Sequence, residues 1–200
     1  MKTFYVCSYG GSGSTLLANS LKQYGRVEHI HSRNPPLELE YIGNNEGGDT
    51  YYEWFNGIKV PENQLEDFSV IFIYKHPVKA IYSRYIPYYQ DCHKLHMDHV
   101  QVNRNTELKS VLSQKKDLFG ITEFYNNYTT KNEKRNYKIH CVKYEELFEK
   151  QNELSQALGI GPLQLHKKET AKNYSHYTEL AEIYKDLIYD MNNRAFIDIV

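Results

Sequence analysis

Short apolar runs recur along the chain, each rich in β-branched and aromatic residues and bounded by polar or turn-forming residues. Runs of this length and composition are typical of buried β-strands. The pattern predicts four strands and a weaker fifth, which cover residues 3–7, 27–30, 70–74, 137–144 and, for the weaker one, 57–60.

Apolar residues at helical spacing fill the segments between these runs. They predict helices that cover residues 16–24, 78–85, 118–128, 145–158 and 177–191. Pro77 stands at a first helical position, and Gly159 closes a helix. Strands that alternate with helices favour right-handed βαβ units. We therefore expect one α/β domain over residues 1–200, with a parallel sheet between two layers of helices.

The charges nearly cancel, with 24 basic and 25 acidic side chains. A general nucleic-acid binder would carry a basic excess, so we expect no nucleic-acid partner. Cys7 and Cys141 lie inside apolar runs, as unpaired cysteines do in a reducing compartment. The chain begins almost at once with a strand-like run, and no apolar run is long enough to span a bilayer. We expect a cytoplasmic protein without a membrane partner.

A glycine-rich loop separates the first predicted strand from the first predicted helix. Its glycines allow a tight path on which successive N–H groups point at an anion, and the helix N-terminus adds partial positive charge. A flexible turn of small residues is the alternative, but the strand–loop–helix context favours a phosphate site. The residues expected to hold the phosphate are Gly10, Gly11, Ser12, Gly13, Ser14 and Thr15.

The chain lacks two parts of the phosphate site of a P-loop nucleoside triphosphatase. Gly13 is followed by Ser14 and Thr15 without the lysine of a Walker A motif. The run 70–74 ends in Lys75, where a magnesium-holding acid would stand. A P-loop kinase with a degenerate loop is therefore an alternative and not the leading interpretation.

A second pattern follows the third predicted strand. Lys75 stands at its carboxyl end, Pro77 starts the next helix, and Ser83 lies on that helix. Ligands of α/β sheets bind at the carboxyl ends of strands, so lysine and serine can share a phosphate there. Taken alone, the pair is better explained as an exposed lysine and an ordinary helical serine.

Together the two patterns resemble the sulfotransferase family, whose donor is 3′-phosphoadenosine 5′-phosphosulfate. The resemblance implies a P-loop-type fold in which Gly10 to Thr15 hold the 5′-phosphosulfate. It also implies that Lys75 and Ser83 hold the 3′-phosphate, as an Arg-x-Pro motif and a later serine do in the family. The stretch from Cys141 to Leu147 is similar to a third family motif, a strand followed by Tyr-Glu and leucine.

The resemblance implies a transferase that moves a sulfuryl group to a hydroxyl or amine acceptor and needs no metal. Two positions depart from the family pattern. Gly11 stands where a lysine or arginine is usual, and Lys75 replaces an arginine. These departures leave open a catalytically weak or inactive nucleotide-binding module of the same fold.

Three residues are candidates for the chemistry. His31 and Arg33 lie where one branch of the family places an acidic base and an arginine, and a histidine near neutral pKa can act as the base. A hydrogen-bonded loop histidine is the alternative for His31. Lys59 resembles a lysine of cytosolic members, and it is a candidate for the charge missing at Gly11. Cys92, His93, His96 and His99 fit no familiar zinc spacing, so we expect no metal site.

Overall fold

The structure is a computed structural model of the 200-residue chain, and it describes residues 1–42, 50–51, 57–85, 97, 100–167 and 173–200. Within these residues a six-stranded sheet has the order β3-β2-β1-β4-β5-β6. The first five strands in this order run parallel, and β6 pairs antiparallel with β5. The strands are β1 (Thr3–Cys7), β2 (Arg26–Ile30), β3 (Thr50–Tyr51), β4 (Phe68–Tyr74), β5 (Ile139–Lys143) and β6 (Ile197–Ile199).

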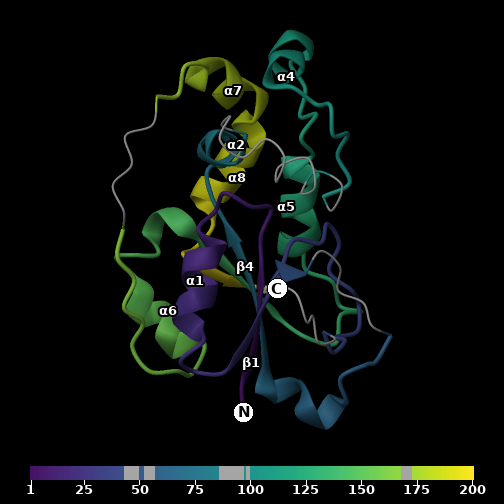
Figure 1. Cartoon of the computed structure of the whole chain (residues 1–200), viewed down its shortest axis with the longest axis vertical. Helices are drawn as coiled ribbons and strands as arrows, with labels where there is room; N and C mark the ends of the chain where they lie inside the picture. The colour runs from purple at the N-terminus through teal and green to yellow at the C-terminus, as the bar shows by residue number, and fades with distance from the viewer. Residues whose placement is uncertain (43–49, 52–56, 86–96, 98–99, 168–172) are drawn as a thin grey trace.

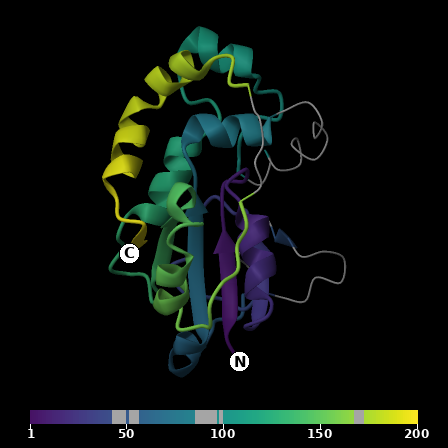
Figure 2. The ribbon, with the colours of Figure 1, turned by 90° about the vertical axis from the view of Figure 1, so that its left-hand side faces the viewer.

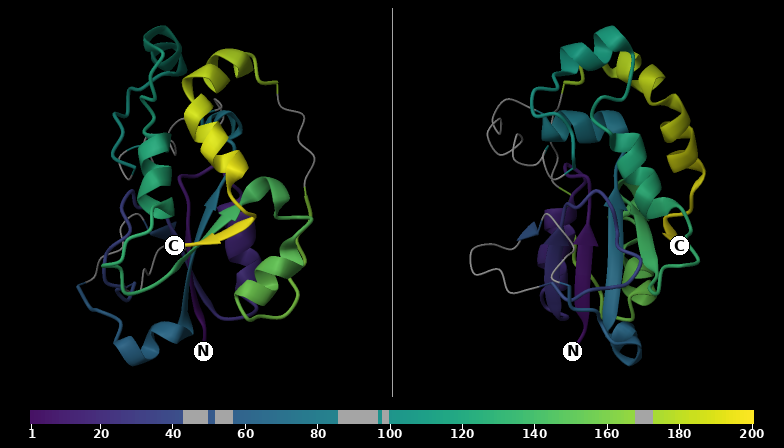
Figure 3. Two further views of the ribbon diagram at one scale, coloured as in Figure 1. Left: turned by 180° about the vertical axis from the view of Figure 1, so that it is seen from behind. Right: turned by 90° about the vertical axis from the view of Figure 1, so that its right-hand side faces the viewer.

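Helices cover both faces of the sheet and its carboxyl edge. Viewed edge-on, α1 (Ser14–Leu21) lies on one side of β1 and β4, while α5 (Ile121–Thr129) and α8 (Lys185–Asn193) lie on the other (Figures 2 and 3). Beyond the carboxyl ends of the strands lie α2 (Pro77–Arg84), α4 (Leu108–Gln114) and α7 (Tyr177–Ile183) (Figure 1). Among the residues described, no helix is long and apolar enough to cross a membrane.

Alternation along the strands divides the core into two parts, because successive side chains of a strand point to opposite faces. Phe4 and Val6 of β1 pack with the buried leucines of α1 and α6 (Gln151–Ala157). Tyr5 and Cys7 join a larger cluster with aromatic residues of α5. Both faces of β1 are therefore buried, as expected for a central strand of a parallel sheet.

The structure corrects three predicted elements. Residues 57–60 form no strand of the sheet, and Lys59 makes only an isolated antiparallel bridge to Glu40. The segment after Lys143 begins as a short 3-10 turn, η3 (Tyr144–Glu146), before α6. The last helix is divided at Tyr184, whose backbone leaves the helical conformation while its buried hydroxyl donates to Asp117 Oδ1 at 2.7 Å.

The parallel sheet was predicted, but its antiparallel edge was not. β6 comprises three residues and follows α8 directly. Before β4, a 3-10 segment, η1 (Glu62–Asp67), was also missed. Both elements are too short to show a period in the sequence, so only their pairing or packing defines them.

Candidate functional site

The crevice between β1 and β4 is the topological switch point of the sheet. β1 is followed in the chain by β2 on one side, whereas β4 pairs with β1 on the other side. Open parallel sheets bind ligands in this crevice, at the carboxyl ends of the strands. The glycine loop leaves β1 here, and Lys75 leaves β4 here. The sheet thus brings the two predicted phosphate motifs to one edge.

The loop has the backbone that its sequence requires. Gly10, Gly11 and Gly13 have φ values of 104°, 69° and 80°, in the left-handed region that side chains rarely adopt. Gly13 caps α1 without a side-chain hydrogen bond, and the first turn of α1 carries no acidic residue. The first N–H groups of α1 therefore face the loop with uncompensated partial positive charge.

Helix α2 packs directly on the first two glycines. A Cβ atom at Gly10 would lie 1.8 Å from Nη1 of Arg84, and one at Gly11 would lie 2.8 Å from the carbonyl oxygen of Ala80. The Cβ of Ser83 is 3.1 Å from the same position at Gly11. This packing explains why position 11 bears no basic side chain, since α2 occupies the space that it would need.

A tyrosine joins the last glycine to the lysine of the second motif. A Cβ at Gly13 would lie 2.3 Å from Cε2 of Tyr144, so the ring covers this glycine. Nζ of Lys75 lies 4.3 Å from the centre of the same ring. Residues that follow β1, β4 and β5 therefore meet at the loop, and they place an ammonium group beside it.

Buried hydroxyl groups link the loop to the end of β2. The Ser8 hydroxyl donates to Ser14 Oγ at 2.8 Å, and Ser14 Oγ lies 2.8 Å from Nε2 of His29. The Ser14 oxygen accepts from Ser8, and the tautomer of His29 decides which group donates in the Ser14–His29 hydrogen bond. Ser14 thus ties the loop to β2 in this arrangement, whereas Thr15 is exposed on the first turn of α1.

His31 lies behind the loop with 4 % of its surface exposed. Its Nδ1 is 2.7 Å from the carbonyl oxygen of Ser8, which can only accept, so Nδ1 carries a hydrogen. In the neutral ring Nε2 then holds the lone pair. The rings of His29 and His31 lie 4.5 Å apart, and both belong to the polar cluster behind the loop.

Arg33, a predicted catalytic residue, makes its contacts with other segments of the chain. Arg33 donates through Nη1 to the carbonyl oxygens of Val100 and Gln101, at 3.1 and 3.0 Å, and forms an ion pair with Glu123. These contacts join the segment after β2 to α5. The structure therefore gives Arg33 a role in holding these segments together, which its position after β2 did not reveal.

Lys59 is exposed and forms an ion pair with Glu38, which raises the pKa of the lysine above its ordinary value. Its backbone belongs to the bridge with Glu40, and the chain then enters η1, which leads to the start of β4. The glycine loop lies at the carboxyl ends of the strands. Lys59 instead comes before the amino end of β4, which is the opposite end of the sheet. The structure does not bring it to the loop.

Comparison with family models, with curated proteins and with solved structures finds no significant match to this chain.

Arg84 and Tyr144 are the site residues without a predicted role. Arg84 is 5 % exposed, and its guanidinium also lies 5.6 Å from the centre of the Tyr9 ring. The sequence carried no signal for it, because its contact with Gly10 depends on how α2 packs on the loop. Tyr144 belongs to the stretch from Cys141 to Leu147 that is similar to the third family motif, but only the packing shows its contact with Gly13.

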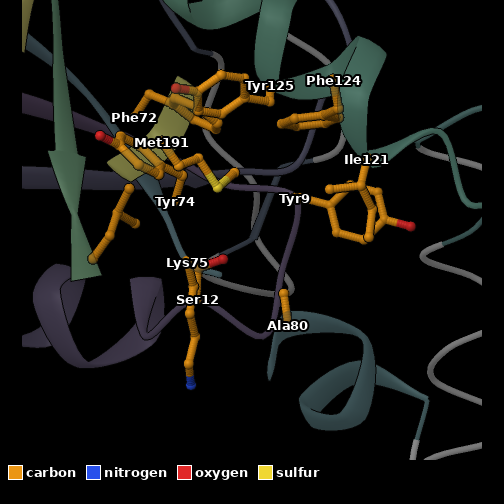
Figure 4. A pocket seen from close by; sticks show the side chains of 11 residues that line it. Tyr9, Ser12, Phe72, Tyr74, Lys75, Ala80, Ile121, Phe124, Tyr125 and Met191 are labelled. Atoms are coloured by element: carbon orange, nitrogen blue, oxygen red, sulfur yellow. The ribbon is translucent and has the colours of Figure 1, made fainter. Parts of the chain in front are cut away.

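A small cavity lies beneath the loop, and Figure 4 shows its lining. Ser12 and Lys75 line it together with aromatic residues of the core. Lys75 and Tyr74 point to opposite sides, as neighbours along a strand do (Figure 4). Tyr9 fixes the loop above this cavity, since its hydroxyl donates to the carbonyl oxygen of Phe119 at 2.8 Å. Burial raises the pKa of Tyr9 well above its ordinary value.

Metal ions in proteins are held by groups of His, Cys, Asp and Glu side chains. No group of three or more that could hold a metal ion occurs within the described ranges. Cys92, His93, His96 and His99, which the sequence brought to attention, lie outside those ranges.

Proposed function

We propose that this protein is a transferase of the P-loop sulfotransferase type, which moves a sulfuryl group from 3′-phosphoadenosine 5′-phosphosulfate to a hydroxyl or amine. The observation that carries the proposal is the meeting of the glycine loop with Lys75 and Ser83 at the switch point. Two anion-binding motifs at one crevice suit a donor with phosphate groups at two positions.

In this proposal the loop N–H groups and the N-terminus of α1 hold the phosphosulfate. Lys75 and Ser83 hold the 3′-phosphate. Arg84 supplies, from α2, a positive charge near Gly10 that the loop itself lacks. Positive charge here stabilises the moving sulfuryl group and the leaving phosphate oxygen, which is where charge develops.

Transfer breaks the bond between sulfur and the phosphate oxygen and forms one between sulfur and the acceptor oxygen or nitrogen. The proton of the acceptor must go to a base. We assign this role to His31, because Nδ1 is fixed by the Ser8 carbonyl and Nε2 then holds the lone pair. Substitution of His31 by Ala is expected to lower turnover and leave donor affinity within about threefold.

A second candidate is a nucleotide-binding module of the same fold without transfer activity. The packing at Gly11 favours it, because a Cβ there would lie 2.8 Å from the Ala80 carbonyl oxygen. A loop that cannot carry a cation has less transition-state stabilisation to offer. A degenerate P-loop kinase is weaker, since the loop lacks the lysine after Gly13 and Lys75 follows β4.

The deciding experiment is calorimetric titration with adenosine 3′,5′-bisphosphate, with adenosine 5′-monophosphate as the comparison. Lys75→Ala and Ser83→Ala should weaken the bisphosphate about tenfold each and affect the monophosphate little. Arg84→Met should weaken both. Lys79→Ala, on the same helix but not among the loop contacts, is the matched control. If the protein does not bind the bisphosphate at millimolar ligand concentration, the proposal is wrong.

Labelled donor separates the two candidates that bind nucleotide. Transfer of labelled sulfate to any member of a mixture of hydroxyl and amine acceptors supports the enzyme. Tight bisphosphate binding without transfer supports the binding module. Magnesium-dependent binding of ATP, with indifference to the bisphosphate, would favour the kinase instead.

A further inference from the structure

A second cavity, of about 370 Å³, lies beside the switch point at the carboxyl ends of β4 and β5. Its polar wall includes Tyr74, His76 and Glu145, and its apolar wall includes Ile188 and Met191 of α8. It shares Tyr74 and Met191 with the small cavity beneath the glycine loop. Neither the loop nor the Lys75–Ser83 motif uses the polar groups of this cavity.

Two buried polar atoms at this cavity have no hydrogen-bond partner in the described part of the chain. They are the hydroxyl oxygen of Tyr74, a residue 3 % exposed, and Nδ1 of His76. Buried polar groups in folded proteins are nearly always paired. Their joint exception, in the lining of one cavity, leaves two polar atoms with which a bound molecule can pair.

His76 and Glu145 offer lone pairs at this cavity, which suit a ligand that donates hydrogen bonds. Nε2 of His76 lies 3.2 Å from the Tyr177 hydroxyl, and when Nε2–H donates to that oxygen, Nδ1 is left as an acceptor. Burial, followed by the charge of Lys79, lowers the pKa of His76 to about 4, so the ring stays neutral. Glu145 adds a carboxylate, one oxygen of which accepts the His76 backbone N–H at 3.0 Å.

One carboxylate of the lining, that of Glu145, is left to pair with a cation. The ammonium of Lys143 is held by Glu146 at 2.9 Å and by the Arg194 carbonyl oxygen at 2.8 Å. Glu146 is also paired with Lys150, at 2.6 Å, so its carboxylate is shared between two lysines. Glu145 forms no ion pair within the described ranges, so its carboxylate is the acidic group of the lining that is left to pair with a bound cation.

We propose that this cavity binds a small primary amine, whose ammonium group lies among Glu145, Tyr74 and His76 and whose apolar body packs on Ile188 and Met191. An ammonium has three donors and no acceptor, which matches three acceptors. Binding of the amine does not depend on nucleotide; only its use as a sulfuryl acceptor rests on the proposed function.

The test uses three probes of similar size and different charge, namely 2-phenylethylamine, 2-phenylethanol and 3-phenylpropanoate. Binding to the full chain is followed by ligand-observed NMR without nucleotide at neutral pH. We expect the amine to bind at least about tenfold more tightly than the alcohol, because a hydrogen bond between two charged groups is stronger than a neutral one. The carboxylate should bind least.

Variants locate the site. Glu145→Gln keeps an acceptor for the His76 N–H and removes the charge, so amine affinity should fall about tenfold and alcohol affinity should stay. Tyr74→Phe should weaken the amine about threefold or more. Glu149→Gln, exposed and outside the cavity, is the control that should change nothing. Equal affinity for the three probes, no saturable amine binding, or an unaffected Glu145→Gln variant overturns the proposal and leaves the nucleotide site untouched.

Discussion

Nζ of Lys75 lies over the face of the Tyr144 ring, 4.3 Å from the ring centre. The ring also covers Gly13, so one side chain sets the position of the lysine relative to the loop. A cation over an aromatic face gains about 0.5–2 kcal/mol, depending on how much water is excluded. The contact holds the ammonium close to the place where the proposed phosphate binds.

Loss of this ring should therefore weaken the nucleotide. Tyr144→Ala is expected to lower affinity for adenosine 3′,5′-bisphosphate by about 2- to 30-fold, the range that corresponds to the cation–π energy. Tyr144→Phe keeps the ring and should stay within about twofold. Calorimetric titration measures both. Equal losses for the two variants would show that the hydroxyl, and not the ring, matters.

Gly13 should tolerate substitution less than a glycine of similar φ in open space. A Cβ at Gly13 would strike Tyr144, whereas Gly57, with φ 74°, has nothing within 4 Å of the same position. Left-handed backbone alone costs a non-glycine residue about 1 kcal/mol, so Gly57→Ala should lose that much.

Gly13→Ala adds overpacking and should cost about 2–4 kcal/mol. Urea unfolding measures the difference, and the double variant Gly13→Ala with Tyr144→Ala should recover the steric part. Equal costs at Gly13 and Gly57 would contradict the packing described for Tyr144.

The strands and the glycine loop could be predicted from the sequence because their signals are local. β1 and β4 are continuous apolar runs, and glycines between a strand and a helix identify the loop. The role of Arg84 could not be predicted, because its contact with Gly10 depends on how α2 crosses the loop. Crossing geometry is set by packing between segments far apart in the chain.

The same limit applies to Arg33. Its position after β2 suggested a site residue, but its partners Val100, Gln101 and Glu123 belong to a distant part of the chain. Hydrogen-bond partners at such separations leave no periodic trace in the sequence.

Arg33 should therefore matter for stability and not for nucleotide binding. Arg33→Met removes the donors to two backbone carbonyl oxygens and the ion pair with Glu123, and should lower the free energy of unfolding by about 1–3 kcal/mol. Affinity for the bisphosphate should not change. Lys59→Met, at an exposed ion pair, should leave the urea midpoint unchanged in the same titration. A loss of affinity in Arg33→Met without loss of stability would restore its assignment to the site.

His76 should make stability depend on pH. Its pKa falls from the ordinary value of about 6.5 to about 4 on folding, first through burial and then through Lys79. Between these values the unfolded chain binds a proton that the folded chain does not, so stability falls as the pH falls through this window. Above the window the ring is neutral in both states and adds no slope.

Replacement by Gln removes this titration. Urea unfolding at several pH values should show a smaller loss of stability toward pH 4 for His76→Gln than for the unmodified protein, and parallel behaviour above about pH 7. Parallel curves over the whole range would mean that His76 titrates normally in the folded chain.

The central position of β1 has a consequence for the order in which this protein is assembled. Thr3 pairs with Arg26 on one side and with Phe68 on the other, so β1 gains its second neighbour only after β4 has been synthesised. Pairing between strands far apart in the chain is slow, because the entropy cost of closing the loop between them must be met before their contacts form. A fragment that ends before Phe68 would carry every residue from Gly10 to Thr15, yet it would have no crevice for them to line.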